Sequence, residues 1–467
     1  MSPRLRSLPR LCAVLFGTLL LSWPALYNRY PLLFPDSMSY IESGPRVARA
    51  LFLRDPSGYY GVRSFLYALG IAPFHLASPW PIVFLQSLLA AYIVWLTVRA
   101  FAPRRTTLAY LATIVPLALF TGLPWVSSIV MPDILGALLY LAVFLLVFAP
   151  HTLSRPERVA LILIAWWSAA AHVTHLMLAT GLILFLLASL AVFRALTRPR
   201  LIGLLSTAAI ILAAILSHMA VHGILYGKPS LNGERPPYLT ARLLSDGTGR
   251  RYLLEHCPQA RLALCGFTSN LPDNPDDFLW DASGIWQSAS PEVQTLILRQ
   301  EMPFALATIR AYPRQQRAIS THAFLQQLTS FGISNGANAW LLDEFPTALP
   351  GQRPFYQRSR QAQDALPNEF LSTVQDLTVL ASLAALVILA PFIFRRPPPQ
   401  LIGLTAVIFS TVTANALVTA VLAEVDDRYQ TRVIWLLPLL AALYLLELLH
   451  QRRAAATPAP APVAVSA

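Results

Sequence analysis

The ionisable residues of this sequence gather at the ends of its apolar segments. Asp36 follows the first apolar segment in FPDSMSY, and Asp133 begins the fourth in MPDILGALL. His172 and His175 lie in the short turn AHVTHL between two further segments, and Arg428 precedes the last segment in DDRYQTR. An ionisable residue beside or within a membrane segment costs free energy, so each of these residues requires a reason.

These residue types suit the transfer of a sugar from a lipid-linked donor. A carboxylate can take the proton of an acceptor hydroxyl as general base. An arginine or a histidine can neutralise the phosphate that leaves the sugar, and an apolar bundle can hold a polyprenyl chain. We therefore take Asp36 and Asp133 as candidate catalytic residues, with a candidate substrate- and phosphate-binding set of Arg63, His172, His175, Arg428 and Tyr429.

Several candidates also have a plainer structural role. Asp36 follows a proline and can cap a helix, and Asp133 at a helix start complements the helix dipole. Arg428 can pair with a neighbouring aspartate. Arg63 can extend its charge to lipid headgroups. The sequence leaves these roles open beside the functional ones.

The two histidines also raise the question of a metal. His172 and His175 are three residues apart and share a helical face, as metal ligands can. Interfacial histidines that hydrogen-bond to neighbours are the commoner case, and the HExxH zinc motif is absent. The sequence therefore predicts no cofactor, and a divalent metal stays an alternative.

The composition indicates the elements that must position these residues. The chain has 467 residues, of which 55% are hydrophobic and 12% charged, with a net charge of +12. Its mean hydropathy is +0.54. Soluble proteins carry about 25% charged residues, so an ordinary soluble enzyme and a disordered chain are excluded. The positive charge lies in short clusters between apolar runs, which excludes a nucleic-acid binder and indicates an all-α polytopic membrane protein.

A membrane-spanning helix needs about 20 apolar residues. The sequence predicts about ten spans, at residues 11–27, 80–99, 107–124, 134–150, 158–173, 176–193, 201–223, 374–394, 401–423 and 433–449. Arginine clusters occupy alternate loops, so the positive-inside rule places both termini in the cytoplasm. We expect a bacterial inner membrane, with the candidate residues on its outer face.

The rest of the chain lies outside the predicted spans. An outer loop at 28–79 is expected to carry an interfacial helix at 61–77, and 224–373 is long enough for a mostly helical periplasmic domain. This organisation divides the chain into 1–223, 224–373, 374–450 and a disordered cytoplasmic tail at 451–467. Cys257 and Cys265 fall in the periplasmic domain, where an oxidising compartment favours a local disulfide.

The chain resembles the C-type (GT-C) superfamily of integral-membrane glycosyltransferases. Asp36 in PDSMSY is similar to the acid that these enzymes carry in the first outer loop, and Asp133 in MPD resembles a second acid near spans 3 and 4. The Arg428-Tyr429 pair before a proline-containing last span resembles a late element of several members. The resemblance implies a polyprenyl-phosphate sugar donor and an envelope glycan, lipid or protein acceptor. Many members have two adjacent acids in the first loop, whereas Ser37 follows Asp36 here, which argues against a metal in that loop.

Two other functions fit the same sequence. An O-antigen ligase or polymerase would place its key residues in the large loop, for instance Arg310, Arg314, Arg317 or His322. A transporter or flippase would carry ionisable or broken segments near the bilayer midplane and paired halves. The predicted spans have few such charges and no visible repeat. Transfer of a sugar is therefore the leading hypothesis.

Overall fold

A computed structural model describes residues 3–55, 64–74, 78–231, 235–257, 259–340, 345–395 and 398–456. Across these ranges the chain is helical and contains no strand, apart from an isolated parallel bridge between Leu32 and Ile129. The expected all-α membrane protein is therefore confirmed at this level. Six helices are long and apolar enough to cross a membrane: α5 (Trp80–Phe101), α10 (Val173–Val192), α11 (Arg198–Tyr226), α21 (Asn368–Ile393), α22 (Pro399–Leu422) and the run Asp427–Arg453, which contains α23 and most of α24.

Four further helices coincide with predicted spans but are shorter. They are α1 (Pro3–Leu21), α6 (Thr106–Phe120), α8 (Asp133–Phe148) and α9 (Arg155–Ala170). Apolar stretches of α1, α6 and α8 run for 10 to 17 residues, below the length that spans a typical bilayer unaided. The total of ten spans thus stays a prediction.

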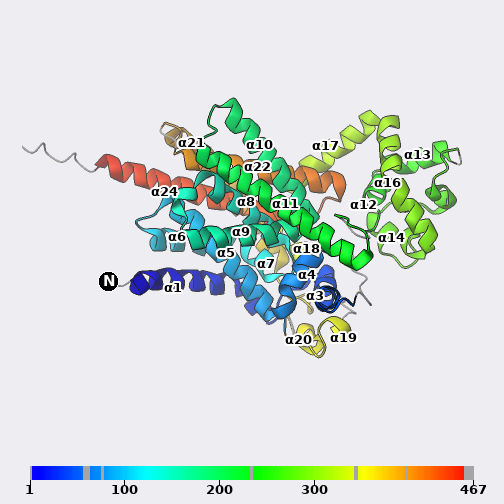
Figure 1. Cartoon of the computed structure of the whole chain (residues 1–467), viewed down its shortest axis with the longest axis horizontal. Helices are drawn as coiled ribbons and strands as arrows, with labels where there is room; N and C mark the ends of the chain where they lie inside the picture. The colour runs from blue at the N-terminus through cyan, green and yellow to red at the C-terminus, as the bar shows by residue number, and fades with distance from the viewer. Residues whose placement is uncertain are drawn as a thin grey trace, which may run out of the picture.

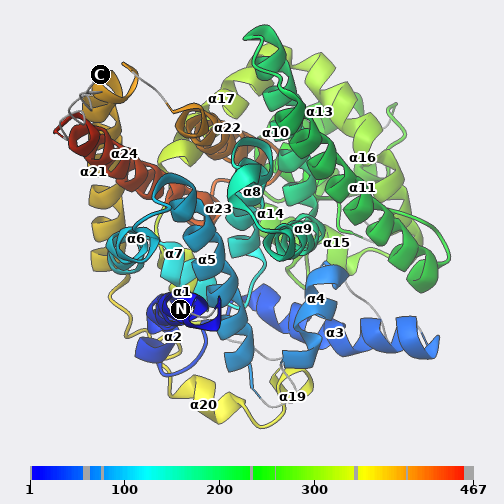
Figure 2. The ribbon, with the colours of Figure 1, turned by 60° about the vertical axis from the view of Figure 1, so that its left-hand side comes forward.

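The centre of the helical bundle is α8. Every residue from Asp133 to Phe148 is buried, and the helix packs against α5, α9, α11 and α22. A helix that is apolar all round lies inside a protein, which explains why α8 can be short and still be enclosed. Figure 2 shows its neighbours arranged around it. Its first residue, Asp133, lies at the end of the bundle that we call the site end.

Arginines collect at the opposite end of the bundle. Arg10 of α1 and Arg99 of α5 both form ion pairs with Glu157 of α9, at 2.6 and 2.7 Å. The beginning of α1 and the end of α24 (Leu436–Ala456) lie toward this same end (Figure 1). The helix α24 continues to Ala456, six residues into the predicted tail at 451–467, while residues 457–467 lie outside the described ranges.

A small lobe with its own apolar core lies beyond the site end (Figure 1). It comprises α12 (Tyr238–Ser245), α13 (Thr248–His256), α14 (Pro275–Leu279), α15 (Ile285–Ser288) and α16 (Pro291–Ala311). A disulfide joins Cys257 to Cys265 within it, with the two Cα atoms 5.5 Å apart. Next comes α17 (Pro313–Thr329), which packs on α22.

The following segments return to the bundle. α18 (Ser334–Ala337), α19 (Phe345–Ala348) and α20 (Arg353–Gln357) are short helices whose buried apolar residues belong to the main core. Of the predicted domain at 224–373, only the residues from Ala241 to Ala305 form the second core. The predicted domain therefore contributes to both cores.

The loop after α1 contains more helix than the sequence predicts. The short α2 (Trp23–Asn28) is followed by α3 (Pro35–Leu53), which has an apolar and a polar face. The helix α4 (Phe65–Ile71) and a 3₁₀ turn at Ala72–Phe74 occupy part of the expected interfacial helix at 61–77. Arg63, which the sequence predicts as a substrate-binding residue, lies outside the described residues.

Candidate functional site

The site is organised by α23 (Asp427–Ile434), a short helix between α22 and α24. Asp426 begins it as N-cap, because its carboxylate accepts a hydrogen bond of 2.8 Å from the backbone nitrogen of Arg428. Residues four apart on a helix share a face, so Arg428 and Arg432 project from the same side. Asn415 of α22 fastens this helix by donating to the carbonyl oxygen of Tyr429 at 2.7 Å.

Asp133 and Arg432 form a buried ion pair at the start of α8. An Arg432 Nη1 atom lies 3.4 Å from Asp133 Oδ1, and both side chains are less than a tenth exposed. Two further nitrogens of Arg432 donate to Asn415 Oδ1 at 2.8 and 3.1 Å. Arg432 therefore has partners on two helices and is held in one position.

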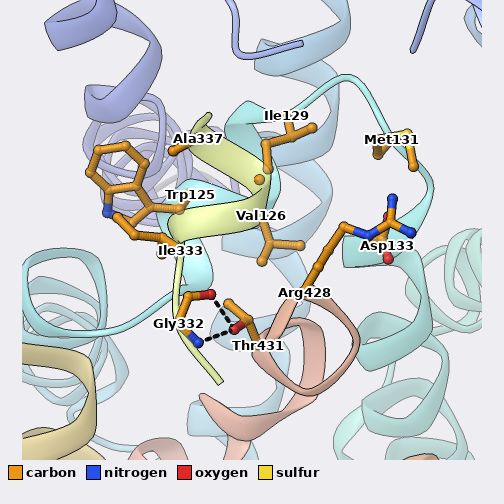
Figure 3. A pocket seen from close by; sticks show the side chains of 11 residues that line it. Trp125, Val126, Ile129, Met131, Asp133, Gly332, Ile333, Ala337, Arg428 and Thr431 are labelled. Atoms are coloured by element: carbon orange, nitrogen blue, oxygen red, sulfur yellow. Dashed lines mark hydrogen bonds between the residues drawn. The ribbon is translucent and has the colours of Figure 1, made fainter. Parts of the chain in front are cut away.

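Arg428 is placed differently from Arg432. Its guanidinium carbon lies 4.1 Å from the ring centroid of Phe34 and 5.1 Å from that of Tyr429. Figure 3 shows Arg428 extending toward Asp133, with which it lines one pocket. The Nε and Nη1 atoms are buried and have no hydrogen-bond partner among the residues that the structure describes. A buried charged donor without a partner is unfavourable.

Asp36 lies close to this arginine but does not line the pocket. It occupies the first turn of α3, two residues after Phe34, and is half-buried. Its negative charge acts on Arg428, as do the charges of Asp133 and Asp426. The structure thus brings the acid after the first helix near the guanidinium before the last one. Phe34 and not Asp36 is the N-cap of α3, so the cap expected of Asp36 is not formed, although an acid in a first helical turn complements the helix dipole.

The candidate histidines approach the site from α10. His172 caps this helix by accepting from the backbone nitrogen of Thr174 at 3.1 Å. His175 is 1% exposed, and its Nδ1 lies 2.9 Å from the carbonyl oxygen of Ser168. The His175 Nε2 atom has no partner within the described ranges and packs against Gly136 of α8. Both histidines act electrostatically on Asp133. They therefore lie near the Asp133–Arg432 ion pair, but they do not line the pocket.

The pocket beside Arg428 is narrow and covered. Its volume is about 20 Å³, which is room for about one water molecule. Residues 332–337, which we call the cover segment, line it through Gly332, Ile333, Gly336 and Ala337. Thr431 of α23 fastens this segment, donating to the Gly332 carbonyl at 2.6 Å and accepting from its nitrogen at 2.9 Å (Figure 3).

An apolar groove between α6, α21 and α24 begins next to the pocket. Its volume is about 710 Å³. Few lining residues are polar, and the hydroxyls of Thr378 and Ser382 donate to carbonyls of their own helix. Thr121 lies at one end of the groove, and a Cβ on the following Gly122 would fall 2.6 Å from Thr431. The groove and the pocket share no lining residue, and Gly122 and Thr431 lie between them.

Acidic residues lie near one another where the small lobe contacts the bundle. Burial raises the pKa of Glu424, between α22 and α23, and the negative charges of Asp276 and Asp426 raise it further. Arg242 of α12 ties the lobe to the bundle here, with its Nη1 donating to the Ala423 carbonyl at 3.2 Å. Within the described ranges no group of three or more His, Cys, Asp and Glu side chains could hold a metal ion.

Arg432, Asn415 and Phe34 are not among the site residues predicted from the sequence. Arg432 had a usable signal, since it lies four residues after Arg428 in a charged segment before an apolar run. Asn415 had a weaker one, as a lone amide within an apolar helix. The residues of the alternative loop site, Arg310, Arg314, Arg317 and His322, are exposed and do not line the pocket.

Comparison with known proteins adds no assignment. No protein family, curated protein or solved structure matches this chain. The function must therefore be argued from the site itself.

Proposed function

We propose that this protein is a membrane glycosyltransferase that moves a sugar from a polyprenyl phosphate to an acceptor hydroxyl. The observation that carries the proposal is the buried guanidinium of Arg428, with two nitrogens that find no partner among the described residues. A phosphate would satisfy these nitrogens, because the planar fork of arginine matches phosphate oxygens with two parallel hydrogen bonds.

The groove between α6, α21 and α24 supports a lipid-linked donor over a soluble one. It is apolar along most of its lining and about 710 Å³ in volume. Thr121 at one end of the groove is followed by Gly122, which lies against Thr431 of the Arg428 pocket. A lipid chain in the groove with its phosphate at this end would therefore approach the guanidinium. The pocket is too small for a phosphate while the cover segment is in place, so binding requires residues 332–337 to move.

The chemical step assigns one role to each residue. The acceptor oxygen bonds to the anomeric carbon while the bond from that carbon to the phosphate oxygen breaks, and the electron pair stays on the phosphate. Arg428 neutralises this charge, and Asp36 takes the proton of the acceptor hydroxyl as general base. Asp133 is a positioning residue, because it holds Arg432 and lies beside Arg428.

We place the site end and the small lobe on the outer face of a bacterial inner membrane. The arginine pairs at the opposite end suit a cytoplasmic face under the positive-inside rule, and α1 begins there. Both termini would then be cytoplasmic. The acceptor would be an envelope glycan, lipid or protein that reaches the pocket past the small lobe.

The first test measures binding of undecaprenyl monophosphate, the expected leaving group, to the purified full-length protein. Arg428→Gln should weaken binding at least about tenfold, because a charge-assisted pair is lost. Asp36→Asn should leave this binding within a few-fold, yet abolish glycosyl transfer from synthetic polyprenyl-phosphate hexoses and pentoses to water or added acceptors.

Two variants on α3 serve as matched controls. Glu42 and Arg46 form a partly exposed ion pair on this helix, and Glu42→Gln and Arg46→Gln should change neither binding nor transfer. Equal affinity for the lipid phosphate in wild type and Arg428→Gln would contradict the proposal. So would movement of the lipid-linked sugar across proteoliposomes without any covalent product.

A further inference from the structure

A second pocket lies at the site end, formed by three segments distant in sequence. Arg29 and Tyr30 follow α2, Trp80 begins α5, and Phe355 and Arg358 belong to α20 and its end. The pocket has a volume of about 450 Å³, within the range of small-molecule sites. None of its lining residues is shared with the Arg428 pocket or with the apolar groove.

The charge of this pocket is positive. Arg29 and Arg358 are exposed, and neither guanidinium hydrogen-bonds or ion-pairs with any residue that the structure describes. No acidic residue is part of the lining. Two free guanidiniums facing one hollow favour an anion with several oxygens, because each arginine offers paired N–H donors.

Aromatic side chains form the rest of the lining. Trp80 is half-buried at the beginning of a membrane-type helix, and Phe355 is 55% exposed. Tryptophan at this position marks the boundary between hydrocarbon and water. Tyr30 is buried beneath them and donates its hydroxyl to Gln352 at 3.3 Å. The pocket thus combines positive charge with apolar surface at the level of lipid headgroups.

The walls of the pocket are held together across the chain. The Gln361 side chain donates to the Leu33 carbonyl at 2.7 Å and accepts from the Leu33 nitrogen at 3.0 Å. The Gln361 backbone nitrogen donates to Asn28 Oδ1 at 2.7 Å. The Arg360 guanidinium stacks 4.3 Å from the Tyr27 ring centroid. The two arginines therefore project from segments that are fixed relative to each other.

We infer that this pocket binds a phosphate group carried on a glycerol or similar polar headgroup, between Arg29 and Arg358. The inference does not depend on the proposed glycosyl transfer. The ligand can be an anionic phospholipid or a soluble phosphate ester, and the two sources share the chemistry that the arginines recognise. The exposed ring of Phe355 would cover the apolar part of either ligand.

The test titrates full-length protein in detergent with phosphatidylglycerol, phosphatidylcholine and glycerol phosphate, and measures bound ligand by native mass spectrometry and calorimetry. Arg358→Gln and Arg29→Asn should each weaken phosphatidylglycerol or glycerol phosphate binding at least about tenfold. Asn tolerates the left-handed backbone of Arg29, whose φ is 68°. Arg353→Gln is the control, because Arg353 is exposed on the same helix and does not line the pocket.

The ligands separate the possible outcomes. If Arg358→Gln and Arg29→Asn weaken only the binding of phosphatidylglycerol, the ligand is a lipid. If they weaken the binding of glycerol phosphate, the ligand is a soluble phosphate ester. If both ligands bind wild type and all three variants equally, or bind none of them, the inference is overturned. Undecaprenyl monophosphate binding in Arg358→Gln should equal that of wild type, so failure here is distinguishable from failure at Arg428.

Discussion

Arg428 and Arg432 lie four residues apart on α23, yet their different surroundings give them different roles. Arg432 contacts Asp133 and Asn415, and its side chain is buried. Arg428 stacks on Phe34 and keeps two nitrogens without partners among the described residues. A fully partnered arginine holds helices together, whereas a partly partnered one can take up a ligand. The same residue type therefore serves structure and binding on one helix face.

The Asp133–Arg432 pair leads to a prediction about stability. Asp133→Asn leaves the Arg432 charge buried with weaker compensation, and removing one partner of a buried pair costs about 3–5 kcal/mol. We expect a loss of free energy of unfolding near that range, measured by denaturation in micelles. A double variant with Arg432→Met should recover part of the loss, because the buried Arg432 charge is then removed together with its partner.

Glu42→Gln provides the comparison for this prediction. Its pair with Arg46 is partly exposed and four residues apart on one helix, where such pairs contribute about 0.3–0.5 kcal/mol. If Asp133→Asn and Glu42→Gln lower stability equally, Asp133 has no special structural role.

The sequence identified part of this site for a clear reason. Asp36, Asp133 and Arg428 are ionisable groups beside apolar segments, and that cost is visible from composition alone. Phe34 and Asn415 are common residue types whose roles arise only when α3, α22 and α23 meet. Pairing between Asp133 and Arg432, 299 positions apart, is likewise a property of the folded chain.

At the scale of elements, the cover segment controls access to the Arg428 pocket. Thr431→Val removes both hydrogen bonds to Gly332 while keeping the volume of the side chain similar. We expect faster hydrogen–deuterium exchange in residues 331–337 and a stability loss of about 1–3 kcal/mol. Thr378→Val is the control, since its hydroxyl donates only within its own helix. Unchanged exchange in Thr431→Val would show that the segment is held by other contacts.

The connection between α22 and α23 leads to a pH prediction. The pKa of Glu424 is raised above its ordinary 4.5 by burial and by Asp276 and Asp426. When folding raises the pKa of a carboxyl, the folded protein becomes less stable as the pH rises from the pKa of the unfolded state through that of the folded state. Glu424→Gln should therefore melt at a higher temperature than wild type at pH 7, and the difference should shrink toward pH 4.5.

Glu255→Gln in the small lobe should behave in the opposite way. Hydrogen bonds from Tyr312 and Arg251 hold the pKa of Glu255 below its usual value, so its ionised form stabilises the folded state at neutral pH. This variant should melt at a lower temperature than wild type at pH 7. Melting curves from pH 4.5 to 7.5 test both signs, and a shared sign would contradict this account.

At the scale of the whole molecule, the apolar helices were predictable because hydropathy depends on local composition. Six of them have the expected length. The long α3 was missed because its mixed polar and apolar faces resemble a loop when only span-length apolar runs are sought. The division of 224–373 between two cores was also hidden, since the packing of Tyr356 and Leu366 on the bundle depends on contacts with distant segments.

The clasp between Gln361 and the chain at Asn28–Leu33 has a consequence for biosynthesis. These partners are separated by 328 to 333 positions, so the clasp cannot close until the ribosome has made most of the protein. At about 5–20 residues per second, that interval is roughly 15 to 65 seconds. During this interval the segment at Asn28–Leu33 lacks its hydrogen bonds to Gln361. A nascent chain arrested before Gln361 would thus leave the insertion machinery without the contacts that hold Asn28–Leu33. We expect proteases to cleave this loop more readily in the arrested chain than in the complete protein.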